Sequence, residues 1–219
     1  TLLSTNPYFQ PPSGQVPSFG FTDETYWFRV NLVAGATIPE SWVVSHRWPA
    51  THIMDVFWVI DGQVVEQYTV GNHVPFSERP IPHRFFLSPL TIKPGSSGTL
   101  YLRIQSANGV QAPIWLAPRA QFFQNDQSKF TLDGIFFGLV LVMVFYNLSV
   151  FFAFRDPNYL LYVIYIGVFG ILQAVFLGSA YQYLWPNFPG FQERSLGILI
   201  PFALMSGGIF VDRFLNMPK

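Results

Sequence analysis

Short β-type runs separated by turn signals follow one another from about residue 21 to residue 120, and no helical period appears before Gln121. Each run has the length of a strand and is bounded by Gly, Pro, Asn or Asp. Asp61 and Gly62, between two of the runs, are typical of a tight hairpin turn. The predicted strands cover residues 26–33, 41–47, 53–60, 64–70, 83–87, 99–105 and 112–116. So many short strands in about 105 residues indicate an all-β domain, a β-sandwich or jelly roll.

Alternation within the strands assigns their faces, because successive side chains of a strand point to opposite sides. In the first and third strands, Phe28 and Trp58 fall on the continuous apolar face and should be buried. Trp27 and Asp55 should point away from that core. The non-core faces mix aromatic and hydrogen-bonding side chains, which suits sugars. The plain alternative is the solvated outer face of a sheet.

A different pattern begins near residue 134. Residues 134–154 and 159–180 carry no charge, and a third apolar segment covers 196–217 with Asp212 and Arg213 inside it. A 21-residue helix spans about 31 Å, the thickness of a bilayer core. We therefore expect an irregular lead-in over 1–20, a sandwich over 21–120, a juxtamembrane linker over 121–133, and three transmembrane helices over 134–217.

Composition supports this division. Half of the 219 residues are hydrophobic and 11% are charged, against roughly 25% in an average soluble domain. Residues 131–219 hold only four acidic and four basic residues. The net charge of zero argues against a nucleic-acid partner. The chain starts at Thr1 without a signal-peptide pattern and stops after an apolar segment, so we expect a fragment or processed product.

Candidate chemistry is sparse. With no cysteine, the sequence offers no thiolate zinc site or cysteine nucleophile. The four histidines lack HxH or HxxxH spacing, and Asp23 with Glu24 lacks an EF-hand pattern, so we predict no metal ligand. P-loop, GxSxG and Rossmann patterns are absent too. We therefore expect no catalytic residue, no cofactor and no enzyme in this chain. The histidines are His46, His52, His73 and His83.

Several ordered motifs together resemble one family. They include FGFT at 19–22, YWFRV at 26–30, PFSERPIPHR at 75–84, LYLR at 100–103, RDPNYL at 155–160 and YLWPN at 183–187. From about Phe19 onward the chain resembles the bacterial seven-transmembrane receptors with diverse intracellular signalling modules, and its soluble part resembles their type 2 extracellular domain.

The resemblance implies a periplasmic jelly roll similar to carbohydrate-binding modules, anchored in the bacterial inner membrane by the first three of seven helices. It also implies a cytoplasmic output domain beyond this chain, often a diguanylate cyclase or a histidine kinase. The expected function is to sense an extracytoplasmic ligand, carbohydrate being one candidate, and to relay it through the bilayer. A homodimer is one assembly to consider. The alternative is a membrane-anchored carbohydrate-binding or adhesion module without signalling.

Orientation does not follow from charge, because three basic residues flank the helices on each side. For the ligand site we select the polar and aromatic residues that match the family pattern and lie on non-core faces or in the proline-rich segment 75–84. They are Trp27, Arg29, Asp55, Arg79 and Arg84. The rival interpretation is structural: Asp55 pairs with one of these arginines and holds the segment against the sandwich.

Overall fold

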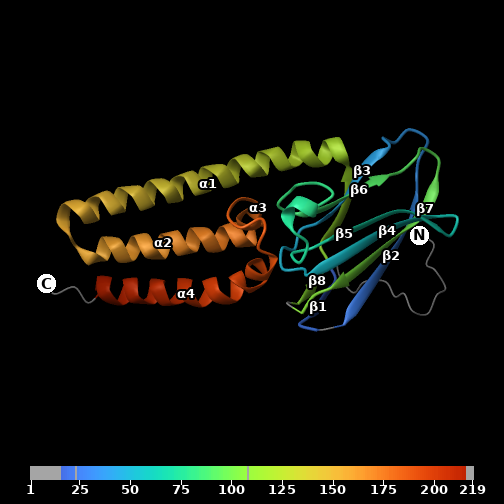
Figure 1. Cartoon of the computed structure of the whole chain (residues 1–219). Coiled ribbons are helices and arrows are strands. Elements are labelled where there is room, and N and C mark those ends of the chain that lie inside the picture. Colours follow the sequence, from blue (N-terminus) through green and yellow to red (C-terminus); the bar gives the residue numbers. More distant parts are fainter. Residues whose placement is uncertain (1–15, 23, 108, 216–219) are drawn as a thin grey trace. The chain divides into compact units, whose positions relative to one another are not determined.

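The computed structural model describes residues 16–22, 24–107 and 109–215 (Figure 1). Several residues of the sequence lie outside this described part. They are most of the lead-in predicted over 1–20, Asp23, which was considered with Glu24 as a metal ligand, Asn108, and the end of the third predicted helix. The chain forms two compact units. Of the described residues, the first unit contains those up to Phe122 together with Pro186–Glu193, and the second contains Phe123–Trp185 and those from Arg194 onward.

Antiparallel strands build the first unit. A four-stranded sheet has the order β2-β7-β4-β5, a three-stranded sheet has the order β6-β3-β9, and β1 pairs with β8. The strands are β1 (Ser18–Gly20), β2 (Thr25–Val33), β3 (Ser41–His46), β4 (Ile53–Ile60), β5 (Gln63–Val70), β6 (Phe86–Thr91), β7 (Ser97–Gln105), β8 (Val110–Gln111) and β9 (Ile114–Pro118). A single 3-10 turn, Phe76–Glu78, lies between β5 and β6.

One hydrophobic core lies between the two larger sheets. The four-stranded sheet contributes the alternate residues of β4 and β7, and the three-stranded sheet contributes β3 and β6 side chains. Burying each large apolar side chain stabilises the fold by about 1.5–3 kcal/mol. The core confirms the predicted β-sandwich. Its fully buried members include Met54, Val56, Trp58, Leu100, Leu102 and Ile104 on one side and Val44, Phe86 and Leu90 on the other.

The predicted faces agree with the structure, although the core-facing residues of the edge strand β2 are less buried than expected. Trp58 is buried in the core, and Trp27 is 49% exposed. Phe28 packs against the core but is only partly buried, and Val30 on the same face is exposed. Both belong to β2, which pairs with β7 alone among the described strands. An edge strand lacks the flanking side chains that complete burial in a central strand.

Proline explains two corrections to the predicted strands. The strand expected at 83–87 is β6, Phe86–Thr91, and it contains Pro89. Because β6 is the edge of its sheet among the strands that the structure describes, a residue without an N–H is tolerated there. The strand expected at 112–116 is divided into β8 and β9, with Pro113 between them. Residues 18–20 of the expected irregular lead-in form β1, which pairs with β8.

The β4–β5 hairpin has the predicted two-residue turn. Ile60 lies opposite Gln63, and Asp61 and Gly62 connect them with φ values of 50° and 78°. Both angles are in the left-handed region that a tight hairpin of this kind requires.

Three of the helices are long and apolar enough to cross a membrane, as judged over the described part of the chain. They are α1 (Arg119–Phe154), α2 (Pro157–Phe176) and α4 (Pro189–Leu215), and α3 (Ser179–Tyr183) is a short helix between the last two. α1 also includes the residues expected to form the linker. The second predicted helix ends four residues early, because Gly178 adopts a φ of 75° and caps the end of α2.

Within the second unit, local sequence explains how α2 begins and packs. The Asp156 carboxylate accepts a hydrogen bond from the Asn158 N–H at 2.9 Å, and Pro157 occupies the first helical position. Farther along, a Cβ built on Gly170 would lie 3.0 Å from Val140 of α1. Glycine therefore lets α1 and α2 approach closely.

Candidate functional site

The outer face of the four-stranded sheet gathers polar side chains into one row. Arg103 of β7 lies opposite Trp27 of β2 on one side and opposite Asp55 of β4 on the other. Asp55 in turn lies opposite Thr69 of β5. The antiparallel register therefore brings side chains from four strands together across the sheet.

Asp55 holds this row in place. Its Oδ2 accepts a hydrogen bond from Arg103 Nη1 at 2.7 Å, and its Oδ1 accepts one from the Thr69 hydroxyl at 2.7 Å. The second terminal nitrogen of Arg103 donates to Gln105 Oε1 at 3.2 Å. Asp55 is 6% exposed, whereas the Arg103 side chain is 36% exposed. A buried carboxylate thus fixes an accessible guanidinium by charge-assisted hydrogen bonds.

An aromatic pair lies beside the polar row. The rings of Trp27 and Phe57 stack with centroids 5.9 Å apart and planes 20° from parallel. The neighbouring row of the register places Tyr101 between Arg29 and Phe57. Flat apolar rings next to fixed hydrogen-bonding groups can hold a ligand that has an apolar face and polar edges, as a sugar does. We call Trp27, Phe57, Asp55, Thr69 and Arg103 the outer-face site.

The five residues selected from the sequence separate into two groups. Trp27, Arg29 and Asp55 belong to the outer face of one sheet, as alternation indicated. Arg79 and Arg84 lie in the segment between β5 and β6, and both are buried. Their role as ligand contacts stays a prediction.

Aromatic contacts and a backbone bond hold the two segment arginines. The Arg79 guanidinium lies 4.9 Å from the ring centre of Phe76 and 4.8 Å from that of Phe86, and it donates to the His83 carbonyl at 2.8 Å. The Arg84 guanidinium lies 4.9 Å from the ring centre of Phe85. These contacts give both side chains a structural role in the segment.

The rival interpretation paired Asp55 with one of the selected arginines, and the structure pairs it with an arginine outside that set. The partner is Arg103, in the adjacent strand, so this ion pair joins two strands of one sheet. Sequence reasoning did not select Arg103, Thr69 or Phe57 for the site. Alternation already placed Arg103 and Phe57 on non-core faces, but only the register shows which strands are neighbours.

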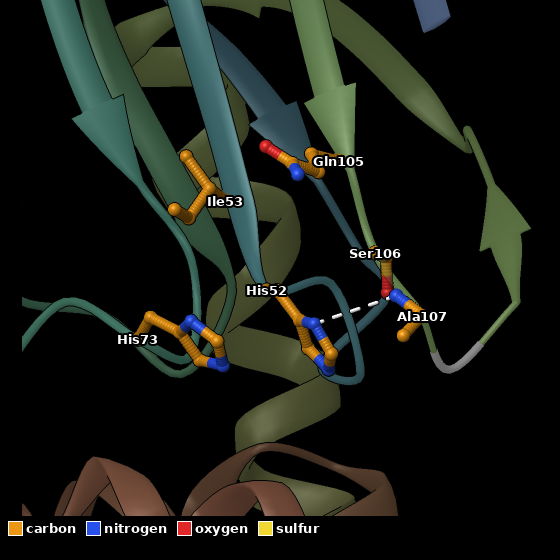
Figure 2. Close-up of a pocket in the computed structure, with 6 residues that line it drawn as sticks. All are labelled: His52, Ile53, His73, Gln105, Ser106 and Ala107. Atoms are coloured by element: carbon orange, nitrogen blue, oxygen red, sulfur yellow. Dashed lines mark hydrogen bonds between the residues drawn. The ribbon is translucent and has the colours of Figure 1, made fainter. Parts of the chain in front are cut away.

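A second group of titratable side chains lies at one end of the same sheet. His52, directly before β4, and His73, after β5, stack with ring centroids 4.5 Å apart. Their Nε2 atoms lie 3.8 and 3.4 Å from the two carboxylate oxygens of Glu193. The two histidines line an adjoining pocket of about 160 Å³ together with Ile53, Gln105, Ser106 and Ala107 (Figure 2).

Burial sets the charge of two histidines. The pKa of His52 is lowered, first by burial and then by the neighbouring His73, while Glu193 acts in the opposite direction. His52 is therefore neutral near pH 7. Burial also lowers the pKa of His46 from 6.5 to about 3. The Nε2 of His46 lies 2.6 Å from the Thr51 hydroxyl oxygen inside the sandwich.

Family models match nearly the whole chain. The 7TMR-DISM extracellular 2 model matches residues 2–118, and the 7TM diverse intracellular signalling model matches residues 129–219. Among curated proteins no relative matches the chain. The boundary between the two models falls within α1, just after the sandwich. The chain therefore belongs to the seven-transmembrane receptors with diverse intracellular signalling modules and combines their type 2 extracellular domain with part of their membrane domain.

Proposed function

We propose that this chain is the sensing part of a receptor in the bacterial inner membrane, and that the outer-face site binds a carbohydrate outside the cytoplasm. The stacked pair of Trp27 and Phe57 beside the fixed Arg103 is the observation that carries the proposal. The extracellular and membrane domains of the family support the sensor role.

A sugar ring would lie on the exposed Trp27 indole and bury its apolar face there. Arg103, Gln105 and Thr69 would supply hydrogen bonds to its hydroxyl groups. Because Asp55 already holds Arg103 and Thr69, little side-chain freedom is lost when the ligand binds. The site would thus favour a ligand with alternating apolar and hydroxyl surfaces over a small anion.

Covalent continuity offers a route for the signal. β9 ends at Pro118 and α1, the first membrane helix, begins at the next residue. Phe122, in the first turn of α1, packs with Val43 and Leu87 on the outer side of the three-stranded sheet. A ligand that prefers one packing of the sandwich would shift the receptor between two states. The helices would then relay that shift to a cytoplasmic output domain.

The loop between α2 and α4 supports an orientation. Residues Pro186–Glu193 belong to the same compact unit as the sandwich, and the Phe76 N–H donates to the Pro186 carbonyl at 3.1 Å. A loop in contact with the sandwich must lie on the same side of the membrane. We therefore place the sandwich and this loop outside and the connection between α1 and α2 inside.

A ligand screen tests the proposal. The whole chain in detergent micelles would be heated with a panel of oligosaccharides, including cell-wall glycan fragments, and the melting of the sandwich followed by tryptophan fluorescence. A ligand at 100 times its dissociation constant adds about 2.7 kcal/mol of stability. We expect a saturable rise in melting temperature with at least one oligosaccharide. A rise that is equally large in Arg103→Ala would contradict the proposed site.

A further inference from the structure

Two imidazoles and a carboxylate converge at the end of the four-stranded sheet. The rings of His52 and His73 are nearly parallel, with 14° between their planes, and Figure 2 shows them side by side. One atom from each of His52, His73 and Glu193 can be chosen so that all three lie within 4.8 Å of one another. The outer-face site does not use these three residues.

The backbone fixes the histidine pair. The Asn72 N–H donates to the Thr51 carbonyl at 2.9 Å, and the His73 N–H donates to the His52 carbonyl at 3.2 Å. Gly71 allows this close approach: its φ is 148°, and a Cβ there would lie 2.0 Å from the His52 carbonyl oxygen. Only glycine fits at residue 71. The approach of its backbone to that of His52 is what brings the two histidines together.

We propose that His52, His73 and Glu193 bind a divalent transition-metal ion of the zinc class. Two imidazole nitrogens and one carboxylate oxygen form a donor set that zinc uses in proteins, with one coordination position left for water or another ligand. Ligand atoms around a tetrahedral zinc at 2.0–2.1 Å lie roughly 3.3 Å apart, and the three donors lie within 4.8 Å of one another, so they must close by up to about 1.5 Å. His73 and Glu193 can make this movement, because each side chain is more than one-third exposed.

Hydrogen bonding at His52 gives the binding step a specific signature. The Ala107 N–H donates to His52 Nδ1 at 3.4 Å, which places the proton of the neutral ring on Nε2. Coordination through Nε2 requires the proton on Nδ1 instead, and an N–H there cannot accept from Ala107. Metal binding should therefore release the Ala107 amide, and the adjoining pocket leaves space for the ring to turn.

The donor set also selects the ion. Ca²⁺ and Mg²⁺ prefer oxygen ligands, whereas imidazole suits Zn²⁺, Co²⁺, Ni²⁺ and Cu²⁺. The site would thus discriminate against the most abundant extracellular divalent cations. A bound ion would join the ends of β4 and β5 to Glu193 of α4, the third apolar helix. This would be an input to the receptor separate from the carbohydrate site.

Zn²⁺ titration of the whole chain in detergent micelles tests the inference, with Co²⁺ absorption as a report on the coordination number. His73→Ala and Glu193→Gln change exposed side chains, so the fold should survive both. Glu40→Gln, at another exposed glutamate, is the matched control. We expect one Zn²⁺ per chain, at least tenfold weaker binding in His73→Ala and in Glu193→Gln, and unchanged binding in the control. Faster amide exchange of Ala107 should accompany Zn²⁺ binding.

Three outcomes would overturn the inference. These are no Zn²⁺ binding in the micromolar range, equal binding by wild type and both variants, or Ca²⁺ competing at concentrations similar to those of Zn²⁺. None of them bears on the outer-face site, because its oligosaccharide test uses different residues and a different probe.

Discussion

Acid should destabilise the sandwich through His46. This side chain is fully buried, its Nε2 lies 2.6 Å from the Thr51 hydroxyl, and its ring stacks on Phe86 with centroids 6.1 Å apart. Burial lowers the pKa of His46 to about 3, because no water solvates a charged imidazole there. The folded chain therefore keeps His46 neutral over a pH range in which the unfolded chain protonates it.

The sign and size follow from linkage. A group whose pKa is lower in the folded state costs nothing above its unfolded pKa of 6.5, and it costs stability as pH falls from there toward about 3. Each pH unit in that window removes about 1.4 kcal/mol. Between pH 7 and pH 5 the loss due to His46 is about 2 kcal/mol, and any folded-state pKa below about 4 gives the same value.

Urea unfolding at pH 7, 6 and 5 measures the loss. The chain would be studied in detergent micelles by tryptophan fluorescence, since five of its six tryptophans precede Phe122. His46→Gln removes the titrating group. The other histidines are present in both proteins, so their contribution to the pH dependence cancels in the difference. We expect the stability difference between wild type and variant to change by about 2 kcal/mol from pH 7 to pH 5. A difference that stays constant with pH would refute the reasoning.

Three further outcomes are expected. Gly98→Ala should destabilise the sandwich by about 1–3 kcal/mol or more in urea unfolding, because its Cβ would lie 2.6 Å from the buried Trp58 ring; an unchanged midpoint would place the indole elsewhere. Arg79→Ala should lower the melting temperature, because the lost ring contacts and hydrogen bond reduce the free energy of unfolding by about 2–3 kcal/mol. A stable variant that lost ligand binding would instead make Arg79 a contact residue. In intact spheroplasts an impermeant thiol reagent should label Asn187→Cys and not Asn158→Cys, and the opposite pattern would reverse the orientation.

Alternation along the strands was enough to predict the core. Met54, Val56 and Trp58 share a face by period two, and all three are buried. The turn at Asp61 and Gly62 was equally readable, because few residue pairs tolerate two successive positive φ values. Both features depend on residues close together in the sequence.

Strand alternation could not predict which residues lie next to each site residue in space. Asp55 and Arg103 are 48 residues apart, and their ion pair depends on β7 lying between β2 and β4. His52 and His73 are brought together by the close backbone contact at Gly71. Glu193 follows both of them in the sequence and is separated from them by two apolar helices, α1 and α2. Motif spacing reports only local clusters, so it could not reveal either group.

Ligand binding at Trp27 tests the central claim most directly. The oligosaccharide that gives the largest stabilisation would be titrated into wild type, Trp27→Ala and Trp115→Ala, the last as a control because Trp115 is 57% exposed on the other sheet. The comparison uses equilibrium dissociation constants, and unfolding curves show that each variant folds. We expect Trp27→Ala to weaken binding at least tenfold and Trp115→Ala to leave it unchanged. Equal affinity of wild type and Trp27→Ala would contradict a ligand site on the outer face.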